Sequence, residues 1–376
     1  MTMFVRIAQL ISFAAILVLT LGACSSSGVV QQGNKPSEVK GIASNVATYH
    51  PVSWQELPGW GVDNLTEAWG AWRISCQALI KSRESNQWRE TCHRAQQLAN
   101  PSNQMIRDYF ERYFQVMEIR HAKSSGQFLA GTAQGLITGY YEPEIRGSLK
   151  RGGVYQTPLY AYPETWRKNK PARLPSREEL LSGEFLKGKE LVWVADPIAA
   201  AFMQIQGSGK VLLEDGRTIR LGFAGTNEQP FKSFAQWLID RKEMTRSQAS
   251  MQGITEWAKK NPSRINEMLN ANPRYVFFKE IPNSDLGPIG SIGVPLTPGR
   301  SIAVDWKAIP QGAPIYLSTT YPSTGQLLQR LVFAQDTGSA IVGAVRADFY
   351  WGSGVSAGEQ AGRMKQSGRL WVLLPK

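Results

Sequence analysis

Three short apolar runs in the C-terminal part of the chain each contain one aspartate. They read SIAVDW (residues 301–306), LVFAQDTG (331–338) and AVRADFYWG (344–352). Small, β-branched and aromatic residues dominate these runs, and glycine or proline interrupts the chain between them, which predicts β-strands joined by tight turns. An ionised carboxylate is costly inside an apolar strand unless it is paired or hydrogen-bonded.

Asp305, Asp336 and Asp348 are therefore the candidates for acid–base chemistry. The alternative for each is an aspartate at a strand end that accepts hydrogen bonds from backbone N–H groups. That alternative fits Asp305 best and Asp348 least, because aromatic residues flank Asp348. The sequence contains no HExxH, and no histidine lies in its C-terminal third to complete a catalytic triad, which argues against serine and zinc hydrolysis.

The remaining chain divides into helix-rich and strand-rich regions. Residues 55–125 carry apolar side chains at spacings of three and four, which predicts packed helices. From about residue 135, short strand-like runs dominate, with Asp215-Gly216 expected in a type I′ hairpin turn. Helical patterns return at 231–269 before the final strands. Because helices and strands do not alternate one by one, we expect an α+β or β-barrel protein rather than a doubly wound sheet.

Composition and charge limit the classes of function. The 376 residues carry 42 Lys and Arg against 30 Asp and Glu, a net charge of +12, and 42% are hydrophobic. This is a globular composition, long enough for about two domains. A basic protein often binds nucleic acid, but outside the cytoplasm the anionic partners are lipid head groups and the carboxylates of peptidoglycan stem peptides. Charge alone does not choose between them.

The N-terminus resembles a bacterial lipoprotein signal. A short apolar stretch, 7–21, follows Arg6 and ends in the lipobox-like Leu21-Gly22-Ala23-Cys24. We expect residues 1–23 to be a signal peptide, Cys24 to be lipidated and 24–55 to form a tether; the alternative is an ordinary signal with an incidental cysteine. Ser25 after the cysteine resembles the pattern that sorts lipoproteins to the outer membrane.

Two further cysteines, Cys76 and Cys92, are separated by 16 positions. Export to an oxidising compartment permits a disulfide between them. Two buried thiols on packed helices fit the sequence equally well.

Several motifs, in order, resemble the membrane-bound lytic murein transglycosylase A family. They are Thr138-Gly139-Tyr140-Tyr141-Glu142-Pro143, Leu174-Pro175-Ser176-Arg177, Gln204-Ile205-Gln206-Gly207-Ser208-Gly209, Phe223-Ala224-Gly225, Asn272-Pro273-Arg274-Tyr275-Val276-Phe277-Phe278 and the three-aspartate region. The resemblance extends from about residue 60 to 376.

The resemblance implies a mainly β fold with N-terminal helices, of the α+β class. A double-psi β-barrel catalytic domain would comprise residues 56–144 plus 245–376, with a second β-barrel domain inserted at 145–244. The sugar chain would lie in a groove between the two domains.

The resemblance also implies roles for particular residues. Asp348 would be the sole acid/base, with a raised pKa caused by its apolar neighbours Val345, Ala347, Phe349 and Trp351, and Asp336 and Asp305 would support it. The residues expected to bind glycan are Thr138, Tyr140, Tyr141, Gln206, Gly207, Ser208, Gly209 and Trp351. No metal or cofactor is implied. Ser339 and Val342 replace the glycine and lysine that are usual in the family, which leaves their effect on the local loop open.

The function implied is a peptidoglycan lytic transglycosylase, which cleaves the MurNAc-β-1,4-GlcNAc bond and forms 1,6-anhydro-MurNAc ends in cell-wall turnover. The alternatives are a lysozyme-like hydrolase and a non-catalytic glycan-binding envelope lipoprotein. The expected partners are peptidoglycan glycan strands and outer-membrane lipid, on the periplasmic side, and no nucleic acid. Exo or endo cleavage, dependence on stem peptides and protein partners stay open.

Overall fold

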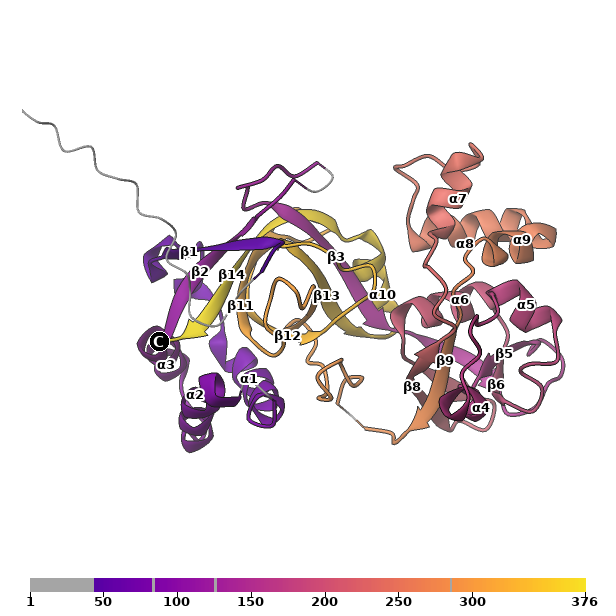
Figure 1. Cartoon of the computed structure of the whole chain (residues 1–376), viewed down its shortest axis with the longest axis horizontal. Coiled ribbons are helices and arrows are strands. Elements are labelled where there is room, and N and C mark those ends of the chain that lie inside the picture. The colour runs from indigo at the N-terminus through magenta and orange to yellow at the C-terminus, as the bar shows by residue number, and fades with distance from the viewer. Residues whose placement is uncertain (1–43, 83–84, 125–126, 285) are drawn as a thin grey trace, which may run out of the picture. The chain divides into compact units, whose positions relative to one another are not determined.

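The computed structural model describes residues 44–82, 85–124, 127–284 and 286–376 (Figure 1). The predicted signal peptide 1–23 and Cys24 lie outside these residues. The described chain contains two β-sheets of eight and six strands. Helices precede the first long strands and cover parts of both sheets.

The eight-stranded sheet combines strands from both ends of the chain. Its order is β1-β2-β14-β11-β12-β10-β13-β3. The strands are β1 (Ala47–Val52), β2 (Phe114–His121), β3 (Gly135–Glu142), β10 (Ser301–Val304), β11 (Pro314–Thr320), β12 (Leu327–Asp336), β13 (Arg346–Ser353) and β14 (Lys365–Pro375).

A further pairing closes this sheet into a barrel. The strand β14 pairs with β3 through Lys365 opposite Thr138, while β3 also pairs in parallel with β13. The six strands β3, β14, β11, β12, β10 and β13 therefore form a closed ring, which removes the exposed edges of an open sheet. Phe333, Phe349 and Trp371 belong to its buried core. A barrel-like, mainly β fold with helices confirms the predicted fold class.

The six-stranded sheet has the order β5-β6-β4-β7-β8-β9. Its strands are β4 (Glu144–Ser148), β5 (Thr157–Tyr160), β6 (Glu190–Val194), β7 (Gly209–Leu213), β8 (Thr218–Thr226) and β9 (Val276–Ile281). The strand β9 lies beyond residue 244, yet it pairs with β8 along most of its length. The predicted limits of an inserted domain, 145–244, stay a prediction.

The hairpin between β7 and β8 differs from its predicted turn type. Gly216 has φ +82°, and its N–H donates to Leu213 O. Asp215 does not have a positive φ, although a type I′ turn requires one at both central residues. The pairing of Leu213 N with Arg217 O describes a type I turn followed by a glycine bulge. The hairpin is confirmed and the type I′ assignment is wrong.

The N-terminal helices are α1 (Leu65–Leu79), α2 (Ser85–Gln97) and α3 (Asn103–Tyr113). A disulfide joins Cys76 of α1 to Cys92 of α2, with a Cα–Cα distance of 5.2 Å, which resolves the two alternatives for these cysteines. Residues 114–121 were expected to be helical but form β2. Val116, Met117 and Ile119 are all buried, so this strand lacks the alternation of polar and apolar residues that marks a half-exposed strand.

The remaining helices are shorter and lie between or beside the strands. They are α4 (Glu164–Lys168), α5 (Arg177–Ser182), α6 (Pro197–Gln206), α7 (Phe234–Asp240), α8 (Met251–Lys260), α9 (Ile265–Asn270), α10 (Gly354–Arg363) and the 3-10 helices Trp54–Glu56, Trp60–Val62 and Pro262–Arg264.

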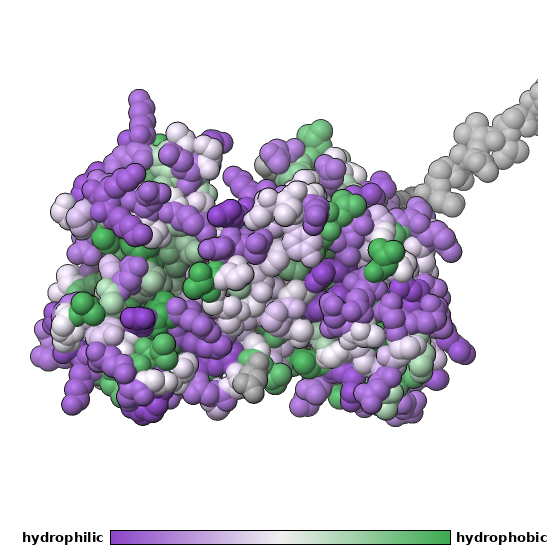
Figure 2. All heavy atoms as spheres, turned by 180° about the vertical axis from the view of Figure 1, so that it is seen from behind, coloured by the Kyte–Doolittle hydropathy of each residue, from purple (hydrophilic) through white to green (hydrophobic). Residues whose placement is uncertain are grey.

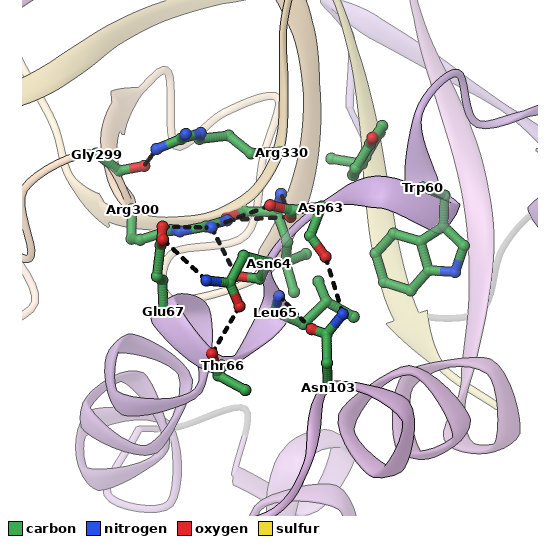
Figure 3. A network of polar contacts seen from close by, with 12 residues as sticks. Trp60, Asp63, Asn64, Leu65, Thr66, Glu67, Asn103, Gly299, Arg300 and Arg330 are labelled. Carbon is green, nitrogen blue, oxygen red and sulfur yellow. Dashed lines mark hydrogen bonds and ion pairs between the residues drawn. The ribbon is translucent and has the colours of Figure 1, made fainter.

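A buried ion pair joins the start of α1 to the barrel (Figure 3). The Arg300 guanidinium donates to both carboxylate oxygens of Asp63, each at 3.0 Å, and both side chains are almost fully buried. Asp63 also accepts the backbone N–H of Leu331 in β12. Arg300 donates further to Asn64 O and to the exposed Glu67. The bidentate pair of Arg300 and Asp63 therefore fixes the start of α1 against β10 and β12.

Loss of this buried pair should destabilise the whole chain. The change Asp63→Ala removes the buried partner of Arg300 and leaves only the exposed Glu67 as an acidic partner, so we expect a loss of about 3–5 kcal/mol in the free energy of unfolding, measured by urea denaturation. Glu67→Gln removes an exposed partner of the same arginine and should cost less than about 1 kcal/mol. Equal losses for both variants would contradict the role assigned to Asp63.

Most large apolar side chains are buried, and those that are exposed are spread over many elements. Figure 2 shows one face of the molecule, on which hydrophilic residues predominate and hydrophobic ones form small separate groups. Among the described residues, no helix is both long enough and apolar enough to cross a membrane.

Candidate active site

Asp348 lies in the middle of β13, between β3 and β10. The register places it opposite Thr138 of β3 and Ala303 of β10. The Thr138 hydroxyl donates to Asp348 Oδ1 at 2.6 Å. Within the described residues, Asp348 Oδ2 has no hydrogen-bond partner, so one carboxyl oxygen is held in place and the other is free to exchange a proton.

Burial raises the pKa of Asp348 above its usual value, although the Thr138 hydrogen bond and the charge of Arg346 oppose the shift. A raised pKa was expected for Asp348 from the sequence, but the shift was attributed there to the neighbours of Asp348 along the chain. Ala347 and Phe349 point into the barrel core, on the opposite face of β13. The apolar surroundings come from a separate cluster of buried residues: Tyr140, Leu296, Ala303, Ile341 and Tyr350.

Asp336 lies at the end of β12 and lines the same cavity as Asp348. Its Oδ1 accepts the backbone N–H groups of Ser291 and Thr337, and its Oδ2 accepts the Tyr140 hydroxyl at 3.1 Å. Burial raises the pKa of Asp336 to about 6, because it outweighs these three donors, and the charge of Asp348 acts in the same direction.

Asp305 does not line the cavity. It is 6% exposed and follows β10, where its two carboxylate oxygens accept the backbone N–H groups of Lys307 and Gly343. This is the strand-end arrangement considered for it in the sequence. Gly343 lies in the loop between β12 and β13, so Asp305 holds the end of the loop that begins after Asp336.

A cavity of about 590 Å³ opens beside the two carboxyls. Of the residues predicted to bind glycan, five line it: Tyr140, Tyr141, Gln206, Gly207 and Ser208. Gln206 Oε1 accepts the Tyr141 N–H at 3.2 Å, which joins the end of α6 to β3. Thr138 reaches the site through its hydrogen bond to Asp348.

The structure places two predicted residues elsewhere. Gly209 is buried against Met203, so close that a Cβ would lie 2.3 Å from the Met203 methyl group. Trp351 packs on Phe349, with ring centroids 5.0 Å apart, and lines a second cavity with Tyr321 and Gln360. Trp351 is an odd number of positions from Asp348 along β13 and therefore faces the other way.

Sequence reasoning missed several polar residues of the cavity. Arg177, Arg274 and Lys279 line it, all from elements next to or within the six-stranded sheet. The first two occur in the motifs that carry the family resemblance, but no role was assigned to them. Ser339, which departs from the family pattern, accepts a hydrogen bond from Arg274 Nη1 at 2.7 Å.

A buried ion pair links the site to the six-stranded sheet. Glu142 ends β3 and accepts Arg220 Nε of β8 at 2.9 Å and Nη2 at 3.2 Å. Ser353 at the end of β13 also donates to Glu142. Across the described chain, no three His, Cys, Asp or Glu side chains gather in a way that could hold a metal ion.

Comparison with known proteins agrees with this geometry. The model of the MltA specific insert domain matches residues 136–279, and that of the 3D domain matches 300–374. Membrane-bound lytic murein transglycosylase A of Escherichia coli K12 is 36% identical over 245 residues, which are 63% of this chain and 65% of that protein. The chain belongs to the membrane-bound lytic murein transglycosylase A family.

Solved structures extend the likeness over most of the chain. The lytic transglycosylase LtgG of Burkholderia pseudomallei is 48% identical, with a TM-score of 0.59 over 89% of this chain and 96% of that one. E. coli MltA with bound chitohexaose is 29% identical, with a TM-score of 0.65 over 81% of this chain and 89% of that one. The family resemblance stated from the sequence motifs is confirmed.

Two substitutions should move the pKa of Asp348 in opposite directions. Thr138→Val removes a donor that stabilises the carboxylate and should raise this pKa further. Asp336→Asn removes a neighbouring negative charge and should lower it, because coupling between two carboxyls is reciprocal. Titration of the carboxyl carbons by NMR measures both shifts. Shifts in the same direction would show that the geometry assigned to the pair is wrong.

Proposed function

We propose that this protein is a peptidoglycan lytic transglycosylase, a carbon–oxygen lyase. It cleaves the MurNAc-β-1,4-GlcNAc bond and leaves 1,6-anhydro-MurNAc ends, in cell-wall turnover. The observation that carries the proposal is the carboxyl of Asp348, desolvated beside a cavity and held through one oxygen by Thr138. Membership of the family supports it.

One carboxyl serves both halves of this reaction. Asp348 donates its proton to the glycosidic oxygen as the bond to C1 breaks and GlcNAc leaves. The C6 hydroxyl of the same muramic residue then attacks C1, and the Asp348 carboxylate accepts the hydroxyl proton. No water is consumed, and the acid is restored. The attack is intramolecular, so it gains from proximity. Thr138 stabilises the carboxylate between the two steps.

The contacts of Asp336 favour this function over a lysozyme-like hydrolase. A hydrolase needs a second carboxylate as a nucleophile or to activate water. Both oxygens of Asp336 already accept hydrogen bonds, from Ser291, Thr337 and Tyr140. Asp336 therefore holds its own loop and contributes negative charge near Asp348, in the supporting role expected of it.

The glycan would lie in the cavity beside Asp348, between a barrel domain (56–144 plus 245–376) and an inserted domain (145–244). The Tyr141 ring can pack on a sugar face, while Gln206 and Ser208 can hydrogen-bond to N-acetyl groups. Gly207, with φ +82°, has no Cβ to hold the chain away from the glycan. The chitohexaose bound to E. coli MltA supports a glycan ligand.

Asp348→Asn keeps the shape of the side chain and removes proton transfer. We expect it to reduce release of 1,6-anhydro-muropeptides from purified sacculi by about 10²- to 10⁴-fold, measured by mass spectrometry of the products. Thermal melting should stay close to the wild type. Asp305→Asn should act mainly through stability instead.

The products also separate the alternatives. Reducing ends would indicate a hydrolase, and no cleavage by the wild type would indicate a glycan-binding lipoprotein. Near-native turnover by Asp348→Asn would place the catalytic acid elsewhere.

We further propose that the protein is anchored in the outer membrane, facing the periplasm, through acylated Cys24. The lipobox and Ser25 support this, and the E. coli relative is named as membrane-bound. A multiply acylated cysteine would anchor stably, since each buried CH₂ contributes about 0.8 kcal/mol.

Cys24→Ala should release the protein from the membrane. We expect an unprocessed or soluble periplasmic form, detected by fractionation of cell envelopes and by the mass of the mature N-terminus. If the variant still fractionates with the outer membrane, the anchor assignment is wrong.

A further inference from the structure

Positive and negative groups lie in different parts of the active-site cavity. Asp336 and Asp348 come from barrel strands, whereas Arg177, Arg274 and Lys279 come from the six-stranded sheet and the segments beside it. Among the described residues, none of these three cations lies within salt-bridge distance of a carboxylate, although the same chain forms many ion pairs elsewhere.

Arg177 is the most constrained of the three. It is only 3% exposed, and burial lowers the pKa of its guanidinium to about 10. Its nitrogens donate to neutral oxygens: Nε to Asn272 O, and Nη2 to Gln204 Oε1 and Arg274 O. Nη1 has no partner within the described residues. A buried cation with only neutral partners is costly, and an anionic ligand group would offset that cost.

Arg274 extends the same positive region toward the barrel. Its Nε donates to Gln229 O and its Nη1 to Ser339 Oγ in the loop after β12. Its Nη2 makes no hydrogen bond in the described part of the chain. Lys279 lies further along β9, is exposed, and also lines the cavity.

We propose that these cations bind a carboxylate carried by the glycan, so that the site selects acid-substituted strands over neutral ones. The inference rests on the proposed function. Muramic residues carry a lactyl group whose carboxylate is either free or linked to a peptide with carboxylates of its own. Neutral chitin-type oligosaccharides carry no such group. Arginine suits this role because its planar donors match a carboxylate.

Arg177 has a structural role that does not explain why Arg274 and Lys279 also line the cavity. Arg177 also braces the chain after α9 through Asn272 O and Arg274 O. Neither Arg274 Nη2 nor Lys279 Nζ has a bracing partner in the described residues. The test therefore uses Arg274 and Lys279 and leaves Arg177 in place.

Binding is measured by calorimetry on the full chain in detergent. The protein carries Asp348→Asn, so that the glycan ligands are not cleaved during the measurement. Three hexasaccharides serve as ligands: neutral chitohexaose, a strand with free lactyl carboxylates, and a strand whose lactyl groups carry peptides. The proposal expects at least one acidic strand to bind about tenfold more tightly than chitohexaose, with an advantage that salt reduces. Whichever acidic strand binds more tightly identifies the carboxylate.

Matched variants separate the effect of a cation inside the cavity from the effect of the protein's net charge on glycan binding. Arg274→Gln and Lys279→Gln should each weaken binding of the acidic strand by a larger factor than binding of chitohexaose, and so remove most of the preference for the acidic strand. Arg246→Gln removes a charge from an exposed residue that does not line the cavity, and should change neither. Equal affinity for neutral and acidic strands, or equal losses in all three variants, would overturn the proposal. Cleavage of sacculi by the wild type tests the proposed function separately.

Discussion

The pairing of β3 with two partners determines the site. One edge of β3 pairs in parallel with β13 and the other pairs with the start of β14, so the ring of six strands closes at this strand. Closure brings Thr138 and Asp348, which are 210 positions apart, into hydrogen-bond contact. Two residues along the same face, Tyr140 reaches Asp336. Gly139, between them, permits this packing, since a Cβ there would lie 2.9 Å from Ala361 Cα in α10. One strand thus orients both carboxyls of the cavity.

Desolvation at this strand has a different outcome for each acid. Glu142, at the end of β3, is fully buried and is compensated by two bonds from Arg220 and one from Ser353. Three hydrogen-bond donors offset the burial of Asp336 only in part, and its pKa is still raised to about 6. Asp348 accepts a single hydroxyl donor, and its pKa is raised as well. A buried carboxyl that accepts few hydrogen bonds carries a proton more readily, because fewer donors offset its burial. Glu142 accepts two of its bonds from a charged arginine, whereas neither aspartate accepts a bond from a cation, and this difference separates the structural acid from the two acids of the cavity.

Local pattern predicted much of this molecule, because strands, turns and helices depend on neighbouring residues. The three aspartates, the β7–β8 hairpin and the first helices followed from it. The errors arose where the orientation or the burial of a side chain depends on residues far away in the sequence. Trp351 was expected to bind glycan on the family resemblance, but the alternation of β13 turns it to the face opposite Asp348. Arg177 was given no role, because its burial and its neutral partners come from residues 27 to 97 positions away. Long-range burial of this kind has no periodic signature in the sequence.

The loop between β12 and β13 shows how the departures from the family motif are accommodated. Asp336 accepts the Thr337 N–H at the start of this loop, and Asp305 accepts the Gly343 N–H at its end. Both ends are thus fixed by carboxylates that the departures do not touch. Val342 is 68% exposed, so its side chain adds no packing constraint. Ser339 adds a hydroxyl that accepts from Arg274, a contact that glycine has no side chain to make. The two aspartates hold both ends of the loop, and Ser339 gives Arg274 a partner across the cavity.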